Sequence, residues 1–262
     1  MKLYYRLLVQ FMGKGFMFVA VHPLDFWMYL VGKIIRMAFF FVFIFSIFRV
    51  APEFAGYNFA TGILIFVTYN FIDILSQTFF FRGLYHLQEL VRRGTFDRAL
   101  TYPISPLFYT AFRMPDPMDF ISLVPVLMLL GWALTQFAQL LTPLAILLYI
   151  LLVANGLLIA FALCTFLASL TFFTQEMEGV WWFYRYAVQV GRYPVEIFRS
   201  PFQFILTWVI PLGVMITFPS RALLGILSWQ FVGGALVLSA LLFYVALSFW
   251  RFALRRYSSA SS

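Results

Sequence analysis

Long apolar stretches separated by short polar breaks dominate the sequence. A helix needs about 20 apolar residues to cross the hydrocarbon core of a bilayer, and several stretches reach that length. The pattern therefore predicts an all-α integral membrane protein, with residues 1–262 forming a single transmembrane domain. We expect six spans, at 26–48, 59–81, 118–137, 143–172, 176–193 and 228–250.

Two apolar segments do not match the pattern of a straight span. Residues 3–20 carry Arg6, Gln10 and Lys14, spaced four apart, so these side chains share one helix face. This favours an interfacial helix on the cytoplasmic leaflet. Prolines recur every seven to ten residues in and just before 195–225. They predict short, broken helices that form a re-entrant element on the outer side.

A polar, basic segment from Arg82 to Arg113 separates the second and third spans. It contains five arginines and two acidic residues, and residues 84–100 show a helical pattern with leucines on one face and a turn at Gly94. A basic segment between two spans is expected in the cytoplasm. Because it is longer than most connections between helices, we interpret it as a surface that another protein contacts.

Composition agrees with a membrane protein. Hydrophobic residues make up 63% of the chain and charged residues 11%, and the mean hydropathy is +0.92. The net charge of +8 does not indicate nucleic-acid binding, because no separate basic domain exists. Most Lys and Arg residues fall on the predicted cytoplasmic side, which places both termini inside a bacterial-type cytoplasmic (inner) membrane. We expect the tail, 258–262, to be disordered.

Three charged residues lie inside predicted spans. Lys33 and Arg36 are in the first span and Asp73 is in the second, at matching depths of roughly 10–15 Å from the cytoplasmic ends. Inserting an unpaired charge costs about 2.5–3.5 kcal/mol. The sequence therefore predicts an ion pair of Asp73 with Lys33 or Arg36. Such a pair either holds two spans together or belongs to the inner part of a transport pathway.

Other polar residues in the spans are candidates for a pathway. Asn70 and Gln77 lie seven residues apart, on one helix face. Asn155 can hydrogen-bond across helices, an arrangement more typical of packing than of substrate binding. Arg185 either pairs with Glu178 or faces the pathway; the sequence leaves both alternatives open.

Two stretches and the overall layout resemble a known family. Residues 93–108 read RGTFDRALTYPISPLF, and residues 193–198 read YPVEIF before further prolines. Together with the order of interfacial helix, spans, basic cytoplasmic segment and broken outer hairpin, they resemble the permease subunits of type-2 ATP-binding-cassette (ABC-2 type) exporters. The layout is similar over nearly the whole chain.

The resemblance implies a permease without its own ATPase. Two permease domains, identical or related, would form the pathway. A separate nucleotide-binding ATPase subunit would bind ATP and magnesium and move the segment 84–100. The sequence itself contains no GxxxxGK[ST] phosphate-binding loop. The alternative for this segment is a solvated face that only fixes topology. The expected ATPase-coupling residues are Leu87, Glu89, Leu90, Arg92, Arg93, Gly94, Phe96 and Asp97.

Other classes of function remain open. An ion-coupled secondary transporter needs inverted repeats and several charges near the bilayer midplane, and a non-catalytic structural subunit would share the layout. An intramembrane enzyme needs an acidic pair, a Ser/His pair or a metal cluster. The only cysteine, Cys164, and the distant His22 and His86 do not indicate a metal site. We therefore expect no catalytic, cofactor-binding or metal-binding residues on this chain; membrane lipid is an expected partner and nucleic acid is not.

Overall fold

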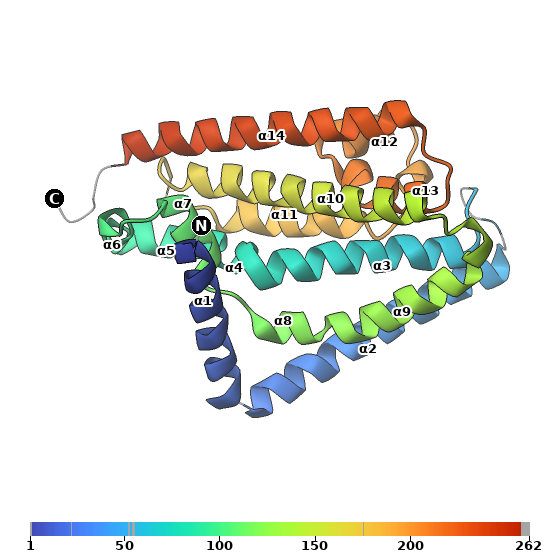
Figure 1. Ribbon diagram of the computed structural model, residues 1–262, viewed down its shortest axis with the longest axis horizontal. Helices are drawn as coiled ribbons and strands as arrows, with labels where there is room; N and C mark the ends of the chain where they lie inside the picture. The colour runs from blue at the N-terminus through green and yellow to red at the C-terminus, as the bar shows by residue number, and fades with distance from the viewer. Residues whose placement is uncertain (1, 22, 52, 54–55, 175, 258–262) are drawn as a thin grey trace.

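The computed structural model describes residues 2–21, 23–51, 53, 56–174 and 176–257, and every regular element within them is helical (Figure 1). The predicted tail lies outside the described residues. The longer helices are α1 (Lys2–Val21), α2 (Pro23–Val50), α3 (Phe59–Ser76), α9 (Leu123–Gln136), α10 (Pro143–Leu170), α11 (Glu178–Val190) and α14 (Trp229–Arg256). The short α-helices are α4 (Arg82–Tyr85), α5 (Leu87–Arg92), α6 (Asp97–Thr101), α7 (Pro106–Phe112), α8 (Pro117–Ile121), α12 (Phe202–Phe204) and α13 (Phe218–Leu223). Tighter or wider helical turns are η1 (Gln77–Phe81), η2 (Ala138–Leu140), η3 (Val195–Ile197), η4 (Ile205–Val209) and η5 (Gly213–Thr217).

Five helices of the described residues are long and apolar enough to cross a bilayer, which confirms an all-α integral membrane fold. Each overlaps one of the predicted spans. The second continues beyond its predicted end through η1 and α4 into α5, so the basic segment that begins at Arg82 is an extension of a span. The five are Pro23–Val50, Phe59–Arg92, Pro117–Gln136, Pro143–Leu170 and Trp229–Arg256.

The fifth predicted span, 176–193, corresponds to α11. This helix has 13 residues, so it is roughly 20 Å long and shorter than a hydrocarbon core of about 30 Å. Two helices that meet at 70°, Phe202–Val209 and Gly213–Leu223, follow it. They are a broken span or a re-entrant loop, and Pro211 lies at the bend. Figure 1 places the start of α1 and the end of α14 toward the same end of the bundle.

Local signals in the sequence set the starts of two spans. The Asn58 side chain accepts a hydrogen bond from the Thr61 backbone N–H at 2.9 Å and begins α3. The Thr142 hydroxyl accepts one from the Ala145 backbone N–H at 3.1 Å and begins α10, where Pro143 occupies the first turn. Both are favoured N-cap residues because they satisfy backbone donors that the first helical turn leaves unpaired.

The core of the bundle surrounds α10, which packs against α3, α13 and α14. Asn155 of α10 donates to the Ala235 carbonyl at 3.4 Å and accepts from the Ser239 hydroxyl at 2.5 Å, both on α14. A Cβ atom at Gly156 would lie 2.7 Å from the Met215 carbonyl oxygen, so only glycine fits there. These contacts fix α10 between α14 and the bent outer helices.

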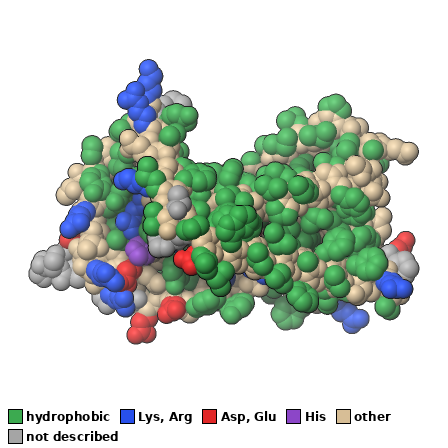
Figure 2. All heavy atoms as spheres, turned by 90° about the horizontal axis from the view of Figure 1, so that it is seen from below, with side chains coloured by type: hydrophobic (Ala, Val, Ile, Leu, Met, Phe, Trp, Pro, Cys, Tyr) green, Lys and Arg blue, Asp and Glu red, His purple; other side chains and the backbone are tan. Residues whose placement is uncertain are grey.

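Polarity is distributed as in a membrane protein. Hydrophobic side chains cover the middle of the molecule, whereas Lys, Arg, Asp and Glu gather toward its two ends (Figure 2). The cationic side chains are more numerous toward the end that carries α5 and α6. Helix α1 runs across the bundle near that end (Figure 1), the orientation that a helix lying along the membrane surface requires.

Candidate functional sites: a cytoplasmic cleft and a charged intramembrane cavity

A cleft of about 650 Å³ opens between the α4–α5 segment and the start of α11. Glu89 is the charged centre of its α5 wall. Its carboxylate accepts from Arg92 at 2.5 Å and also pairs with Arg93, through the ordinary i, i+3 and i, i+4 spacings of a helix. Two of the expected coupling residues, Glu89 and Arg92, therefore line the cleft. The residues that line it are Tyr85, Gln88, Glu89, Arg92, Glu176, Met177, Glu178 and Gly179.

Two of the expected coupling residues do not form a contact surface. Leu87 and Phe96 are both 0% exposed. The Phe96 ring packs against the rings of Phe172 and Tyr257, with centroids 5.3 and 5.4 Å away. The chain's own helices cover Leu87 and Phe96, so neither side chain is exposed to a partner or to the membrane surface.

The remaining coupling candidates have clear places. Leu90 is half-buried beneath the cleft, and Arg92 and Arg93 are exposed. Gly94 adopts a φ of +64°, a left-handed conformation that ends the α5 segment at little steric cost to glycine. Asp97 occupies the first turn of α6, where a carboxylate is favoured by the helix dipole.

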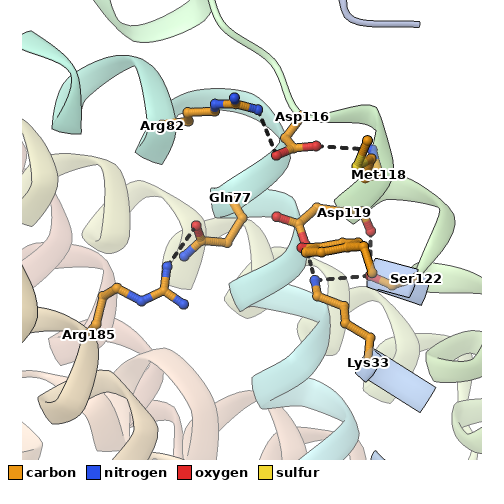
Figure 3. Close-up of polar contacts among 9 residues, drawn as sticks. Lys33, Gln77, Arg82, Asp116, Met118, Asp119, Ser122 and Arg185 are labelled. Carbon is orange, nitrogen blue, oxygen red and sulfur yellow. Dashed lines mark hydrogen bonds and ion pairs between the residues drawn. The ribbon is translucent and has the colours of Figure 1, made fainter. Parts of the chain in front are cut away.

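A second site is a pocket of about 470 Å³ that opens between α2, α3, η1, α8 and α11 (Figure 3). We call it the charged cavity. A smaller void of about 20 Å³ adjoins it deeper along α3 and shares Arg36, Asp73, Gln77 and Arg185 with it. The residues that line the charged cavity are Met28, Tyr29, Gly32, Lys33, Arg36, Asp73, Gln77, Asp116, Asp119 and Arg185.

Lys33 pairs with Asp119, not with Asp73. Its ammonium contacts the Asp119 carboxylate, and the side chains are 13% and 7% exposed. The Tyr29 hydroxyl donates to the same carboxylate at 2.5 Å, and the Lys33 ammonium lies 3.3 Å from the Ser122 hydroxyl. Counting depth along two spans could not identify this partner, because α8 of the third span brings Asp119 between them.

The predicted partnership of Asp73 with Arg36 is not found either. Among the described residues, no Lys or Arg nitrogen lies within the 4.0 Å ion-pair distance of the Asp73 carboxylate, although Arg36 and Asp73 line the same two cavities. A second pair lies beside the charged cavity, where Arg82, which is not part of the lining, meets Asp116 at 3.0 Å. Lys33 and Arg82 are thus each neutralised by an acid from α8 or its N-cap.

The structure brings two of the four pathway candidates together. Arg185 of α11 donates to the Gln77 side-chain oxygen at 3.3 Å and is bonded there rather than to Glu178. The other two lie elsewhere. Asn70 donates to the carbonyl of Phe66 in its own helix at 2.8 Å, and Asn155 bonds α14. Gln77 and Arg185 therefore line the charged cavity, and Asn70 and Asn155 do not.

Sequence reasoning missed two members of this region. The sequence could have identified Asp119 as an intramembrane charge, since it is an acidic residue inside the predicted span 118–137. Arg192 follows α11 and lies with its guanidinium 5.2 Å from the Tyr69 ring centroid and 5.6 Å from that of Phe40. No spacing pattern links Arg192 to residues more than 100 positions earlier. Within the described part of the chain, no group of three or more His, Cys, Asp or Glu side chains could hold a metal ion.

A bundle of apolar helices with a charged cavity between them and a basic segment continuing from one span defines a multi-pass membrane protein. The particular family follows from a comparison with family models. A model described as ABC-2 family transporter protein matches residues 16–261, so the chain belongs to that family. The match confirms the resemblance to ABC-2 type permeases. Comparison with curated proteins and with solved structures gave no match.

Proposed function

We propose that this chain is the non-catalytic permease subunit of an exporter that separate ATPase subunits drive. Two permease domains, identical or related, would form the pathway, and the partner subunits would bind ATP and magnesium. The membrane would be a bacterial-type cytoplasmic membrane, with both termini inside. The family match supports a permease of the ATP-binding-cassette type, and the cytoplasmic cleft supports a place for the partner.

The cleft carries the proposal because its rim is charged and accessible. The side chains of Arg92 and Arg93 are 62% and 70% exposed, and Glu89, which both contact, is 20% exposed. The cleft also joins a span to α11, since α5 continues from α3 and Glu178 begins α11. A subunit that moved within this cleft would act on both helices at once.

The test is purification of the chain in mild detergent from native membranes, with identification of co-purifying proteins and an ATPase assay. We expect an ATPase subunit with vanadate-sensitive turnover. The double variant Arg92→Glu/Arg93→Glu should co-purify with at least tenfold less ATPase than the wild type. Its own elution volume should be unchanged. The matched control is Arg199→Glu, an exposed arginine in the loop before α12.

The outcomes separate the parts of the proposal. A homogeneous preparation from native membranes without any ATPase would overturn it and favour a secondary transporter or a structural subunit. An ATPase that remains bound to the double variant would show that the partner docks away from the cleft.

A further inference from the structure

Three arginines of the charged cavity and its adjoining void have no acidic partner. No carboxylate oxygen of the described residues lies within 4.0 Å of a side-chain nitrogen of Arg36, Arg185 or Arg192. Their contacts are instead with neutral groups. Arg185 lies 5.3 Å from the Phe81 ring centroid and donates to an amide oxygen, and Arg192 donates to a tyrosine hydroxyl at 3.5 Å.

The charge of the region is unbalanced. Lys33 is neutralised by Asp119, and Arg82 by Asp116. Asp73 is then the one remaining acid among the described residues that line the two voids. Three positive charges face one negative charge, which leaves an excess of two positive charges among these residues, where Arg185 and Arg192 are half-buried and Arg36 is exposed. Arginine does not relieve this by losing its proton, since its side chain stays charged in proteins.

The three cationic groups surround one wall of α3. Tyr69, Asp73 and Gln77 follow each other at intervals of four residues and share a helix face. Arg192 contacts the Tyr69 end of this wall and Arg185 contacts its Gln77 end. Tyr69 and Gln77 are eight residues apart, or roughly 12 Å along α3 and the start of η1. The void between the two arginines measures only about 20 Å³, whereas the charged cavity beside it, lined by Arg36 and Arg185, measures about 470 Å³ and has room for a group larger than a single side chain.

An arginine inside a membrane marks a site for an anionic partner. Guanidinium groups present planar pairs of N–H donors that match the oxygens of phosphate and carboxylate. Because the protein supplies too few acids, we propose that the charged cavity binds an anionic, phosphate-type group. The group is carried on a membrane amphiphile or is free in water. That the anion belongs to the transported molecule rests on the proposed function. That the cavity binds an anion does not.

Asp73 has an opposing role in this site. Its carboxylate faces the same space as the arginines and repels an incoming anion. Removal of its charge should therefore tighten anion binding, whereas a purely structural role for the cluster predicts that removal weakens it. The sign of this effect separates a binding site from a structural cluster of charges.

The first probe is a fluorescent phosphatidylglycerol titrated into the purified protein, or its complex, in neutral detergent. Phosphatidylcholine with the same fluorophore is the neutral reference. The second probe is radiolabelled inorganic phosphate in equilibrium dialysis at constant ionic strength. Both probes are measured on Arg185→Gln, Arg192→Gln, Arg185→Lys, Asp73→Asn and the matched control Arg199→Gln, each with an unchanged elution volume.

We expect an acidic probe to bind at least tenfold more tightly than the neutral lipid. Arg185→Gln and Arg192→Gln should each weaken it about tenfold, as expected for a lost hydrogen bond to a charged group. Arg185→Lys should retain most of the binding, Asp73→Asn should tighten it several-fold, and Arg199→Gln should change nothing. If phosphatidylglycerol binds and inorganic phosphate does not, the ligand is a lipid headgroup. If inorganic phosphate binds, the ligand is a soluble anion.

Three results would overturn the inference: neither acidic probe binds, Arg199→Gln weakens binding as much as Arg185→Gln, or Asp73→Asn weakens it. None of these depends on an ATPase. If an ATPase co-purifies while no anion binds, the inference fails alone. If an acidic probe binds and no ATPase is found, the site stands and the exporter proposal fails.

Discussion

The contact between Lys33 and Asp119 makes the most direct quantitative prediction. Both side chains are buried, and the carboxylate also accepts from Tyr29. Removal of one partner of a buried ion pair leaves an uncompensated charge and typically costs about 3–5 kcal/mol. Asp119→Asn and Lys33→Met should each lower the free energy of unfolding by this amount. The double variant Lys33→Met/Asp119→Leu should lose about 1 kcal/mol, because it leaves no buried charge.

The assay is equilibrium unfolding in mixed micelles with increasing sodium dodecyl sulfate, followed by tryptophan fluorescence. The wild type, the two single variants and the double variant form a double-mutant cycle. We expect its coupling energy to be several kcal/mol. The matched control is Asp73→Asn, the same change at the acid that sequence reasoning had assigned to Lys33. Since no ion pair is broken there, its cost should stay below about 1 kcal/mol.

The reasoning would be refuted by additive single variants, which would mean that the two charges do not interact. An Asp73→Asn variant as unstable as Asp119→Asn would also refute it, because Lys33 would then depend on the acid of α3. In the additive case, where the double variant loses the sum of the single losses, packing rather than charge would hold α2 against α8.

Three further changes test the core, each by the same unfolding assay. Gly156→Ala should destabilise by about 1–3 kcal/mol because its new methyl group meets a backbone carbonyl at 2.7 Å; Gly131→Ala, with nothing within 4 Å, should be neutral or slightly stabilising. Phe96→Ala should cost about 3–5 kcal/mol, whereas Leu100→Ala, which is 43% exposed, should cost far less. Asn155→Leu should cost about 0.6–1.7 kcal/mol through its lost bonds to α14. Equal losses within either matched pair, or no loss at position 155, would contradict these assignments.

The basic cytoplasmic segment shows how far pattern alone reaches. Its turn at Gly94 and the exposed positions of Arg92 and Arg93 follow from the sequence, because glycine and charge have strong local preferences. The burial of Phe96 does not follow. An apolar residue in a polar segment can face a partner, the membrane or its own chain, and only the position of Phe172 decides among them.

The charged cavity shows the same division. Intramembrane charges are visible in the sequence, since a span with Lys33, Arg36 or Asp73 is costly wherever it lies. Their partners are not visible, because pairing depends on rotation and lateral order of the helices. If α3 rather than α8 lay next to Lys33, the partner of Lys33 would be Asp73 instead of Asp119.

The sequence by itself determined the spans, the polar breaks and the family resemblance, because solvation by lipid and backbone hydrogen bonding act along each segment separately. Only the tertiary structure decided which charges neutralise each other and that Arg36, Arg185 and Arg192 converge without an acid within ion-pair distance. Electrostatic energy depends on distance in space, and helices far apart in sequence set those distances when they pack.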